Sequence, residues 1–349
     1  MLTLRRTGNR SDRVFAVPEH SFDEVSRETK TCEPVPMDSE APLYIMYTSG
    51  STGAPKGLVH TNAGFCVNMK MAMRHAWDIL PSDILGCPAD IGWQVGHSMN
   101  VYGSLLNGNS ALLFESTPVY PNPARFYHLI QKYKITQFMS APTAYRMLMR
   151  DDAAVSDYDL SSLRAIATCG EITDLSTWTW LHERFGGGDT ATLDSWWQTE
   201  TGCPMLNPWP SAIDASIPQG KSARPFYGVD PCLIGDDRLE SETHGHLCIR
   251  QPWPGMARTI YGDHERYVNT YFKEYPGHYA SGDGAQRDQH GFYQITGRTD
   301  DVINIAGHRL STSEIENIVA KHDAVAEVAV IGANDSIKGS PHLFHRNTE

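Results

Sequence analysis

Residues 47–57 read YTSGSTGAPKG, and the segments on either side of this stretch differ in character. The apolar residues 43–47 before it predict a strand, whereas the mixed periodicity of residues 57–76 after it predicts mainly a helix. A glycine-rich loop between a strand and a helix presents backbone N–H groups to an anion. The stretch therefore predicts an α/β fold with a phosphate-binding loop.

The loop also has suitable side chains, because it combines three glycines, four serine or threonine hydroxyls and Lys56. Glycines let phosphate come close, hydroxyls donate hydrogen bonds, and the lysine supplies positive charge. Gly57 after Lys56 excludes the common P-loop pattern G-x-x-x-x-G-K-[ST]. We expect the triphosphate of a nucleotide to be held by Thr48, Ser49, Gly50, Ser51, Thr52, Gly53 and Lys56.

Beyond the loop, short apolar segments alternate with amphipathic ones. Residues 124–135 predict a helix, residues 137–142 a strand and residues 143–152 another helix. Such alternation predicts parallel strands joined by helical crossovers. From about Pro218, short strands separated by turns predominate, which predicts a smaller β-rich subdomain.

The composition excludes several classes of protein. The 349-residue chain has a formal net charge of −12, which argues against a non-specific nucleic-acid binder. Its seven cysteines include no C-x-x-C pair, so we expect neither a disulfide framework nor a zinc site, and a reducing compartment fits better. No apolar run is long enough for a membrane span. We expect small-molecule substrates and a cytoplasmic location, with the mitochondrion as the alternative; the oligomeric state stays open.

Further motifs resemble, in order, those of the AMP-forming acetyl-CoA synthetases, acyl-CoA ligases of the adenylate-forming superfamily. The motifs are ADIGWQVGHS (89–98), SAPTAYR (140–146), DSWWQTETG (194–202), PWPGMARTIYGDHERY (252–267), SGDGAQRD (281–288) and GRTDDVINIAGHRLSTSEIE (297–316). DSWWQTETG and GDHER are specific to the acetyl-CoA synthetase branch. The resemblance implies the adenylate-forming enzyme fold, in which parallel-rich sheets with helices are joined to a smaller β-rich subdomain and a C-terminal lid.

The resemblance implies a reaction in two halves that uses ATP, Mg²⁺ and CoA. A short carboxylate attacks the α-phosphate of ATP to give acyl-AMP and pyrophosphate, and the CoA thiol then displaces AMP. Positioning and charge neutralisation dominate such chemistry. Catalytic roles are implied for Trp197, which closes the acyl pocket, for Arg298 at ribose and phosphate, and for Asp300 at the hinge of the lid.

The resemblance also implies binding roles. Glu200 matches the magnesium carboxylate, and Asp283 matches the carboxylate that holds the ribose hydroxyls. The other implied nucleotide or CoA ligands are Gly170 and Glu171 beside adenine, Asp194 at the adenine amine, Ser195, Trp196, Gln198 and Thr199 in the same motif, and Arg309 at the CoA tunnel. From the residues alone, the two indoles could equally belong to the core, Glu200 could be a solvated surface residue, and His97 could be a core histidine.

By position, the acyl pocket is lined by Gln94, Val95, Cys169 and Trp197. Acetate enzymes of the family usually have Val-Thr in place of Gln94-Val95, and valine in place of Cys169. Changes in a pocket wall shift selectivity by only about 1–3 kcal/mol per methylene. Acetate is therefore the first expected substrate and propionate the second.

The resemblance further implies that both ends of a family member are missing. We expect residues 1–217 to be the α/β part of the large N-terminal domain, without its upstream portion. Residues 218–299 would be the β-rich subdomain, and residues 300–349 the hinge with an incomplete lid. The Arg-rich start fits an interior strand of the family better than a transit peptide. No residue matches the catalytic lysine of the lid, so a nucleotide-binding fragment with impaired turnover is the alternative to an active ligase.

Overall fold

The computed structural model describes residues 2–3, 20–28, 31–48, 54–115, 117–150, 152–208, 224–299, 302–305 and 308–311, together with residues 315, 319 and 330. The chain divides into two compact units, Met1–Asp38 and Ser39–Glu349. In the first unit, β1 (Leu2–Thr3) pairs in parallel with β2 (His20–Ser21), and α1 (Phe22–Glu28) follows. All further elements belong to the second unit.

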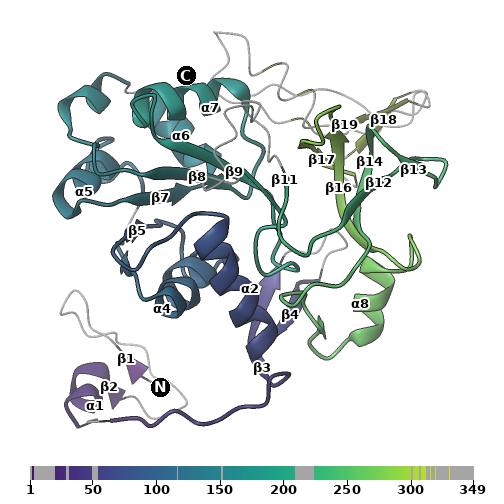
Figure 1. Ribbon diagram of the computed structural model, residues 1–349. Helices are drawn as coiled ribbons and strands as arrows, with labels where there is room; N and C mark the ends of the chain where they lie inside the picture. The colour runs from purple at the N-terminus through teal and green to yellow at the C-terminus, as the bar shows by residue number, and fades with distance from the viewer. Residues whose placement is uncertain are drawn as a thin grey trace. The chain divides into compact units, whose positions relative to one another are not determined.

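A five-stranded parallel sheet lies in the earlier part of the second unit (Figure 1). Its strands are β5 (Ile84–Gly86), β6 (Ser110–Leu112), β7 (Gln137–Ser140), β8 (Ala165–Cys169) and β9 (Ala191–Ser195). Their order is β6-β5-β7-β8-β9, and every neighbouring pair is parallel. The predicted alternation of strands with helical crossovers is confirmed.

Helices cover both faces of this sheet (Figure 1). One face carries α2 (Asn62–His75), α3 (Gln94–Gly96), the π-helix η1 (His97–Gly103) and α4 (Ser104–Asn107). The other face carries α5 (Arg125–Tyr133), α6 (Pro142–Met149), the 3-10 helix η2 (Asp152–Asp157), α7 (Leu175–Trp180) and the π-helix η3 (Leu181–Phe185).

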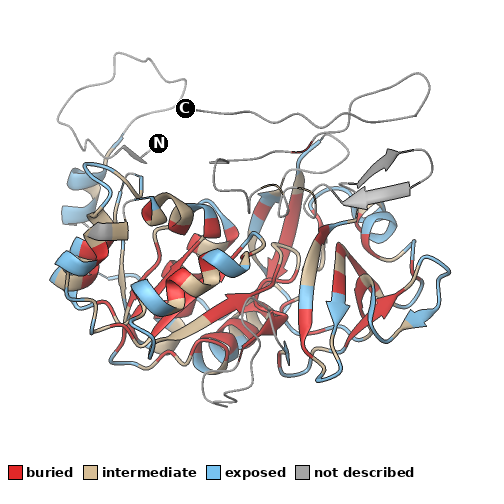
Figure 2. Cartoon of the chain, turned by 90° about the horizontal axis from the view of Figure 1, so that it is seen from above, coloured by how far each residue is buried: buried red, intermediate tan, exposed pale blue. Residues whose placement is uncertain are grey.

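Successive residues of the parallel strands enter different cores. In β8, Ala165 and Ala167 pack with α2, whereas Ile166 packs with α5, α6 and α7. In β7, Met139 likewise packs in the cluster that contains α2, and Phe138 packs in the cluster that contains α5, α6 and α7. Side chains of a strand alternate between its two faces, and a parallel sheet is usually covered on both. Figure 2 accordingly shows buried strands between helices whose outer sides are exposed.

An antiparallel sheet follows, in the order β13-β12-β14-β16-β17. Its strands are β12 (Pro231–Ile234), β13 (Glu240–Ser241), β14 (His244–Ile249), β16 (Tyr279–Arg287) and β17 (Tyr293–Arg298). The other elements of this part are α8 (His264–Tyr271) and two small antiparallel pairs, β10 (Leu206–Asn207) with β11 (Arg224–Pro225) and β18 (Val302–Ile305) with β19 (His308–Ser311). The predicted β-rich character after Pro218 is thus present.

A third sheet corrects the expected surroundings of the phosphate loop. β3 (Pro42–Thr48) confirms the predicted strand, but it is followed by another strand, β4 (Lys56–Thr61), and α2 begins only at Asn62. β4 is antiparallel to β3 and also pairs with β15 (Thr259–Ile260). The loop is therefore flanked by two antiparallel strands, and not by a strand and a helix as the sequence suggested.

Candidate nucleotide and acyl site

Many of the residues predicted for the site lie at or beyond the carboxyl ends of the parallel strands. In chain order the strands are arranged 2-1-3-4-5. Sheets of this kind bind ligands outside the carboxyl ends of their strands, where the strand order reverses. Gln94 follows β5, Gly170 follows β8 and Trp196 follows β9. Because all these strands are parallel, the topology brings motifs that are far apart in the sequence to one edge.

Asp194, in β9, is buried and held by two hydroxyls. Its Oδ1 accepts from Thr168 Oγ1 at 2.9 Å and from Thr173 Oγ1 at 3.0 Å. The next residue, Ser195, lies in the core, where its hydroxyl accepts from the Trp77 indole at 3.1 Å. The Asp194 carboxylate is therefore fixed in position, and the Ser195 hydroxyl supports the packing beneath it.

The Gly170–Glu171 turn is held by α6. Gly170 has a φ of +88°, a left-handed conformation that favours glycine. Glu171 Oε2 accepts from the Thr143 hydroxyl at 2.6 Å, and Arg146 Nη2 donates to the Ile172 carbonyl at 3.0 Å. These contacts hold the turn of Gly170, Glu171 and Ile172 against α6.

Lys56, Glu200 and Tyr271 form a largely buried cluster from three elements. Lys56 Nζ donates to the Tyr271 hydroxyl at 2.8 Å and lies 3.6 Å from Glu200 Oε1. The Tyr271 hydroxyl in turn donates to Glu200 Oε1. The side chains of Lys56 and Glu200 are only 12% and 13% exposed. Burial, together with the Glu200 charge, raises the pKa of Tyr271 far above its usual value, so its hydroxyl stays protonated and bridges the two charges.

A second set of contacts connects this cluster to Asp283. Asp283 Oδ2 accepts from Gln198 Nε2 at 2.7 Å and from the Trp196 indole at 3.0 Å. The Tyr279 hydroxyl donates to Gln198 Oε1 at 2.8 Å, and its ring stacks on Tyr271 with the centroids 5.4 Å apart. Residues predicted for metal, phosphate and ribose therefore belong to one network.

Asp283 and Arg298 are direct partners across β16 and β17. Arg298 Nη1 lies 3.6 Å from Asp283 Oδ1 and donates to the Ser281 carbonyl at 3.2 Å. Gly282 has a φ of +74°, and a Cβ there would lie 2.7 Å from Arg298 Nη2. Glycine at this position thus leaves room for the guanidinium.

The residues predicted for the acyl pocket are largely buried. Val95, Cys169 and Trp197 pack in one core cluster, where burial raises the pKa of the Cys169 thiol to about 12. Gln94 Nε2 donates to Tyr44 and Ser98 hydroxyls, each at 2.8 Å. Gln94 Oε1 is buried and has no hydrogen-bond partner among the described residues. The residues predicted for the pocket wall thus combine apolar groups with one polar amide.

His97 and His60 are histidines with different surroundings. The His97 ring packs edge-on against Tyr44 and Tyr102, with centroids 4.9 and 5.1 Å away, which favours a core role. His60, in β4, was passed over by the sequence analysis. Its Nε2 lies 2.8 Å from the Thr199 carbonyl, and burial lowers its pKa to about 4. A neutral His60 therefore ties the Thr199 backbone to β4.

Some predicted residues cannot be compared with the rest. The predicted site residues outside the described part of the chain are Ser49, Gly50, Ser51, Thr52, Gly53 and Asp300. Thr48 is the last residue of β3, and Arg309 lies in β19 opposite Asn304. Tyr271 was also missed by sequence reasoning, although it follows the GDHER motif closely in the chain.

Comparison with known proteins identifies the family of the chain. The family model described as AMP-binding enzyme matches residues 5–261, and that of the AMP-binding enzyme C-terminal domain matches residues 314–343. The chain belongs to the AMP-binding enzyme family. Among the described residues of this AMP-binding enzyme, no helix combines the length and apolar composition that crossing a membrane requires.

Its similar relatives are named as acetyl-coenzyme A synthetases. The human "Acetyl-coenzyme A synthetase 2-like, mitochondrial" is 52% identical over 320 residues, which are 90% of this chain and 46% of the relative. The Phycomyces blakesleeanus acetyl-coenzyme A synthetase is 46% identical over 344 residues, 97% of this chain and 51% of the relative. This AMP-binding enzyme chain thus spans about half the length of these relatives.

A solved structure confirms the predicted fold class. The anthranilate CoA ligase AuaEII, determined in complex with anthranoyl-AMP, superimposes with a TM-score of 0.79 at 24% sequence identity. The match covers 92% of this chain and 60% of that ligase. The AMP-binding enzyme described here therefore has the α/β fold of the adenylate-forming enzymes.

Proposed function

We propose that this protein is an acetate–CoA ligase, which adenylates a short carboxylate with ATP and transfers the acyl group to CoA with release of AMP. The observation that carries the proposal is the largely buried network from Lys56 and Glu200 through Tyr271 to Asp283. It connects a lysine at the phosphate loop to a carboxylate suited to a metal and to a carboxylate suited to ribose. A nucleoside triphosphate requires all three.

In this proposal, the ribose hydroxyls donate to Asp283, and Arg298 lies beside ribose and phosphate. A carboxylate is a strong acceptor for such hydroxyls. Adenine lies beside Gly170 and Glu171, with Asp194 at its amine. The triphosphate is held by Lys56 and the loop that begins at Thr48, and CoA approaches past Arg309.

The residues also fit Mg²⁺. Glu200 offers one carboxylate oxygen beside Lys56, at the end of the phosphate loop. Mg²⁺ in nucleotide sites is usually held by one or two carboxylates together with phosphate oxygens and waters. When bound, the cation neutralises phosphate charge. Glu200 would hold it, and Lys56 would add positive charge beside it.

Acetate is the proposed acid and propionate the second candidate. Trp197 closes the pocket, and Val95 and Cys169 form apolar walls in the same core cluster. The Gln94 amide distinguishes this pocket from the usual acetate pocket of the family. Its unpartnered Oε1 is the most polar group that a short acid would meet there.

We also propose a division into an α/β part (1–217), a β-rich subdomain (218–299) and a hinge with the start of a lid (300–349). The change from the parallel to the antiparallel sheet supports the first boundary. A cytoplasmic location is proposed, with the mitochondrion as the alternative because one relative is named as mitochondrial.

The test is pyrophosphate exchange into ATP by the purified chain, with acetate or propionate and Mg²⁺. We expect exchange that depends on the acid and that falls by about a hundredfold or more in Glu200→Gln, as expected when a group that stabilises transition-state charge is removed. Asp159→Asn is the matched control, because Asp159 is an exposed carboxylate paired with Lys134. Its exchange should equal that of the unaltered chain.

Calorimetric measurement of AMP binding distinguishes an active ligase from a nucleotide-binding protein without turnover. AMP binding that is lost in Asp283→Asn, without any exchange, would support a nucleotide-binding protein without turnover. Absence of both AMP binding and exchange in a folded chain would overturn both readings.

A further inference from the structure

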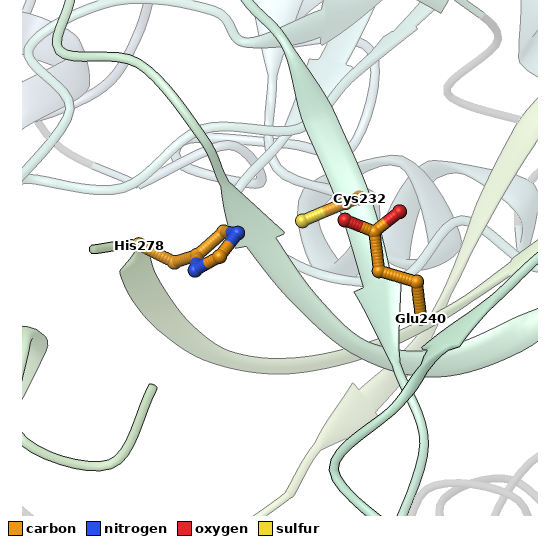
Figure 3. Close-up of side chains that lie close together, drawn as sticks. All are labelled: Cys232, Glu240 and His278. Carbon is orange, nitrogen blue, oxygen red and sulfur yellow. The ribbon is translucent and has the colours of Figure 1, made fainter. Parts of the chain in front are cut away.

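Three side chains of the antiparallel sheet, away from the nucleotide site, have the chemistry of a metal site (Figure 3). Cys232 lies in β12, Glu240 begins β13 and His278 directly precedes β16. Their ligand atoms all lie within 4.8 Å of one another. We propose that Cys232, Glu240 and His278 bind a zinc-type divalent cation, with water as the fourth ligand.

Strand register explains how residues so far apart in sequence meet. Glu240 is opposite Ile234, and Cys232 lies two residues before Ile234 in the same strand, so these side chains share one face of the sheet. Cys248 is opposite Cys232, and Ala280 is opposite Cys248. His278, two residues before Ala280, reaches the same face, and in Figure 3 both its ring and the Glu240 carboxylate approach the Cys232 sulfur.

The spacing is close to what a tetrahedral cation needs. With metal–ligand distances of about 2.0–2.3 Å, the ligand atoms of a tetrahedral zinc site lie about 3.5 Å apart. The ligand atoms, which now lie within 4.8 Å of one another, have to approach by only about 1 Å. Cys232 is 4% exposed and anchored in a small apolar cluster, whereas Glu240 is exposed and His278 half-buried. Adjustment of the two longer side chains can therefore close the site, and the exposed side of Glu240 admits water.

Neighbouring groups already orient two of the ligands. His278 Nδ1 lies 3.3 Å from the Pro276 carbonyl, so the ring can donate there and keep the Nε2 lone pair for a metal. Arg250 donates to both Glu240 oxygens, through Nη2 at 2.7 Å and Nε at 3.2 Å. Each carboxylate oxygen has a second lone pair, so this contact leaves capacity for a cation.

The charges balance when a cation is added. Arg250 forms ion pairs with both Asp230 and Glu240, which leaves one net negative charge in this group. Binding of M²⁺ to the Cys232 thiol forms a metal–sulfur bond and releases the thiol proton to water. The cation and the thiolate together add one positive charge, which neutralises the cluster.

The ligand set selects the kind of metal. A thiolate with imidazole and carboxylate suits zinc or cobalt, whereas Mg²⁺ prefers oxygen ligands only. The site is thus chemically distinct from the Mg²⁺ proposed at Glu200. It also departs from the expectation of no zinc site, which rested on cysteine spacing: the three ligands are separated by 8 and 38 positions, and no short motif contains them.

The test uses Co²⁺ as a spectroscopic probe on the purified, metal-free 349-residue chain. We expect one Co²⁺ per chain with a thiolate-to-cobalt charge-transfer band, which one equivalent of Zn²⁺ removes. Cys232→Ser should abolish the band, and His278→Gln and Glu240→Gln should each weaken Co²⁺ binding by about tenfold or more. His246→Gln, which alters a histidine of the adjacent β14 outside the cluster, and Glu200→Gln should bind as the unaltered chain does.

Two results would overturn the proposal. One is the absence of a charge-transfer band at stoichiometric Co²⁺. The other is a band that persists at unchanged affinity in Cys232→Ser or in both His278→Gln and Glu240→Gln. Because Cys232 is buried, Cys232→Ser could disturb folding, which circular dichroism would reveal. The exposed Glu240 and half-buried His278 variants would then decide the question.

Discussion

The Tyr271 hydroxyl holds together the charges of Lys56 and Glu200, two largely buried groups at the end of the phosphate loop. Tyr271→Phe removes this single oxygen and keeps the ring that stacks on Tyr279. The change deletes two hydrogen bonds to charged groups, one donated by the Lys56 ammonium and one accepted by the Glu200 carboxylate. It therefore tests the network without creating a large cavity.

The expected loss follows from these contacts. A hydrogen bond to a charged group contributes about 1.5–3 kcal/mol net. Lys56 and Glu200 are only 3.6 Å apart, so they can form a direct ion pair and recover part of the loss. We expect the free energy of unfolding to fall by about 2–3 kcal/mol, the upper part of the range for one such bond. Urea denaturation measures this difference.

Tyr267→Phe is the matched control on the same helix. The Tyr267 hydroxyl donates to the neutral Ala257 carbonyl, so its removal should cost about 1 kcal/mol. A double-mutant cycle of Tyr271→Phe with Glu200→Gln should give a coupling of about 1 kcal/mol or more. If Tyr271→Phe were no more destabilising than Tyr267→Phe, or if the coupling were close to zero, the bridging role of this hydroxyl would be refuted.

Three other measurements probe different parts of the site. Burial lowers the pKa of His60 from 6.5 to about 4, so the unfolded chain takes up the proton before the folded chain does as the pH falls. The free energy of unfolding should therefore fall by about 2 kcal/mol between pH 7 and pH 5, and urea titrations at each pH should show that His60→Asn removes this pH dependence. Gly282→Ala should lower the free energy of unfolding by about 1–3 kcal/mol and weaken AMP binding, because the added Cβ would meet Arg298. Gly277→Ala is the control: Gly277 also has a positive φ but lies in open space, so calorimetry should show unchanged AMP binding. Gln94→Met makes the pocket wall apolar and should raise the propionate-to-acetate ratio of kcat/KM in pyrophosphate exchange by about fivefold to tenfold; an unchanged ratio would place Gln94 outside the pocket.

The sequence predicts the parallel sheet well because its strands and helices are local patterns. Residues 57–61, which lie in the antiparallel sheet of β3, β4 and β15, were not predicted as a strand. They were interpreted as part of a helix, but Gly57–Thr61 are all buried and pair with β3, and Leu58 and Val59 also pair with β15. A run buried on both faces lacks the alternation of a half-exposed strand. Its true partner Thr259–Ile260 is distant in the chain, so local periodicity could not reveal it.

The residues of the candidate site were also predicted only in part. Residues inside recognisable motifs, such as Asp283 and Arg298, were predicted, and the register of β16 and β17 brings them together. His60 and Tyr271 act through contacts with Thr199 and Glu200 that depend on tertiary folding. Neither residue type nor spacing marks them in the chain, so only the three-dimensional structure identifies them.

The pairing of β4 with β15 has a consequence for synthesis on the ribosome. Val59 pairs with Thr259, so one edge of the β3–β4 hairpin has no strand to bind until the chain has grown by about 200 residues. At about 5–20 residues per second, that edge waits for about 10–40 s. During this interval an exposed strand edge can pair with other nascent chains. A chaperone that shields residues 56–61 would be most useful at this stage, before the strand that completes the sheet has emerged.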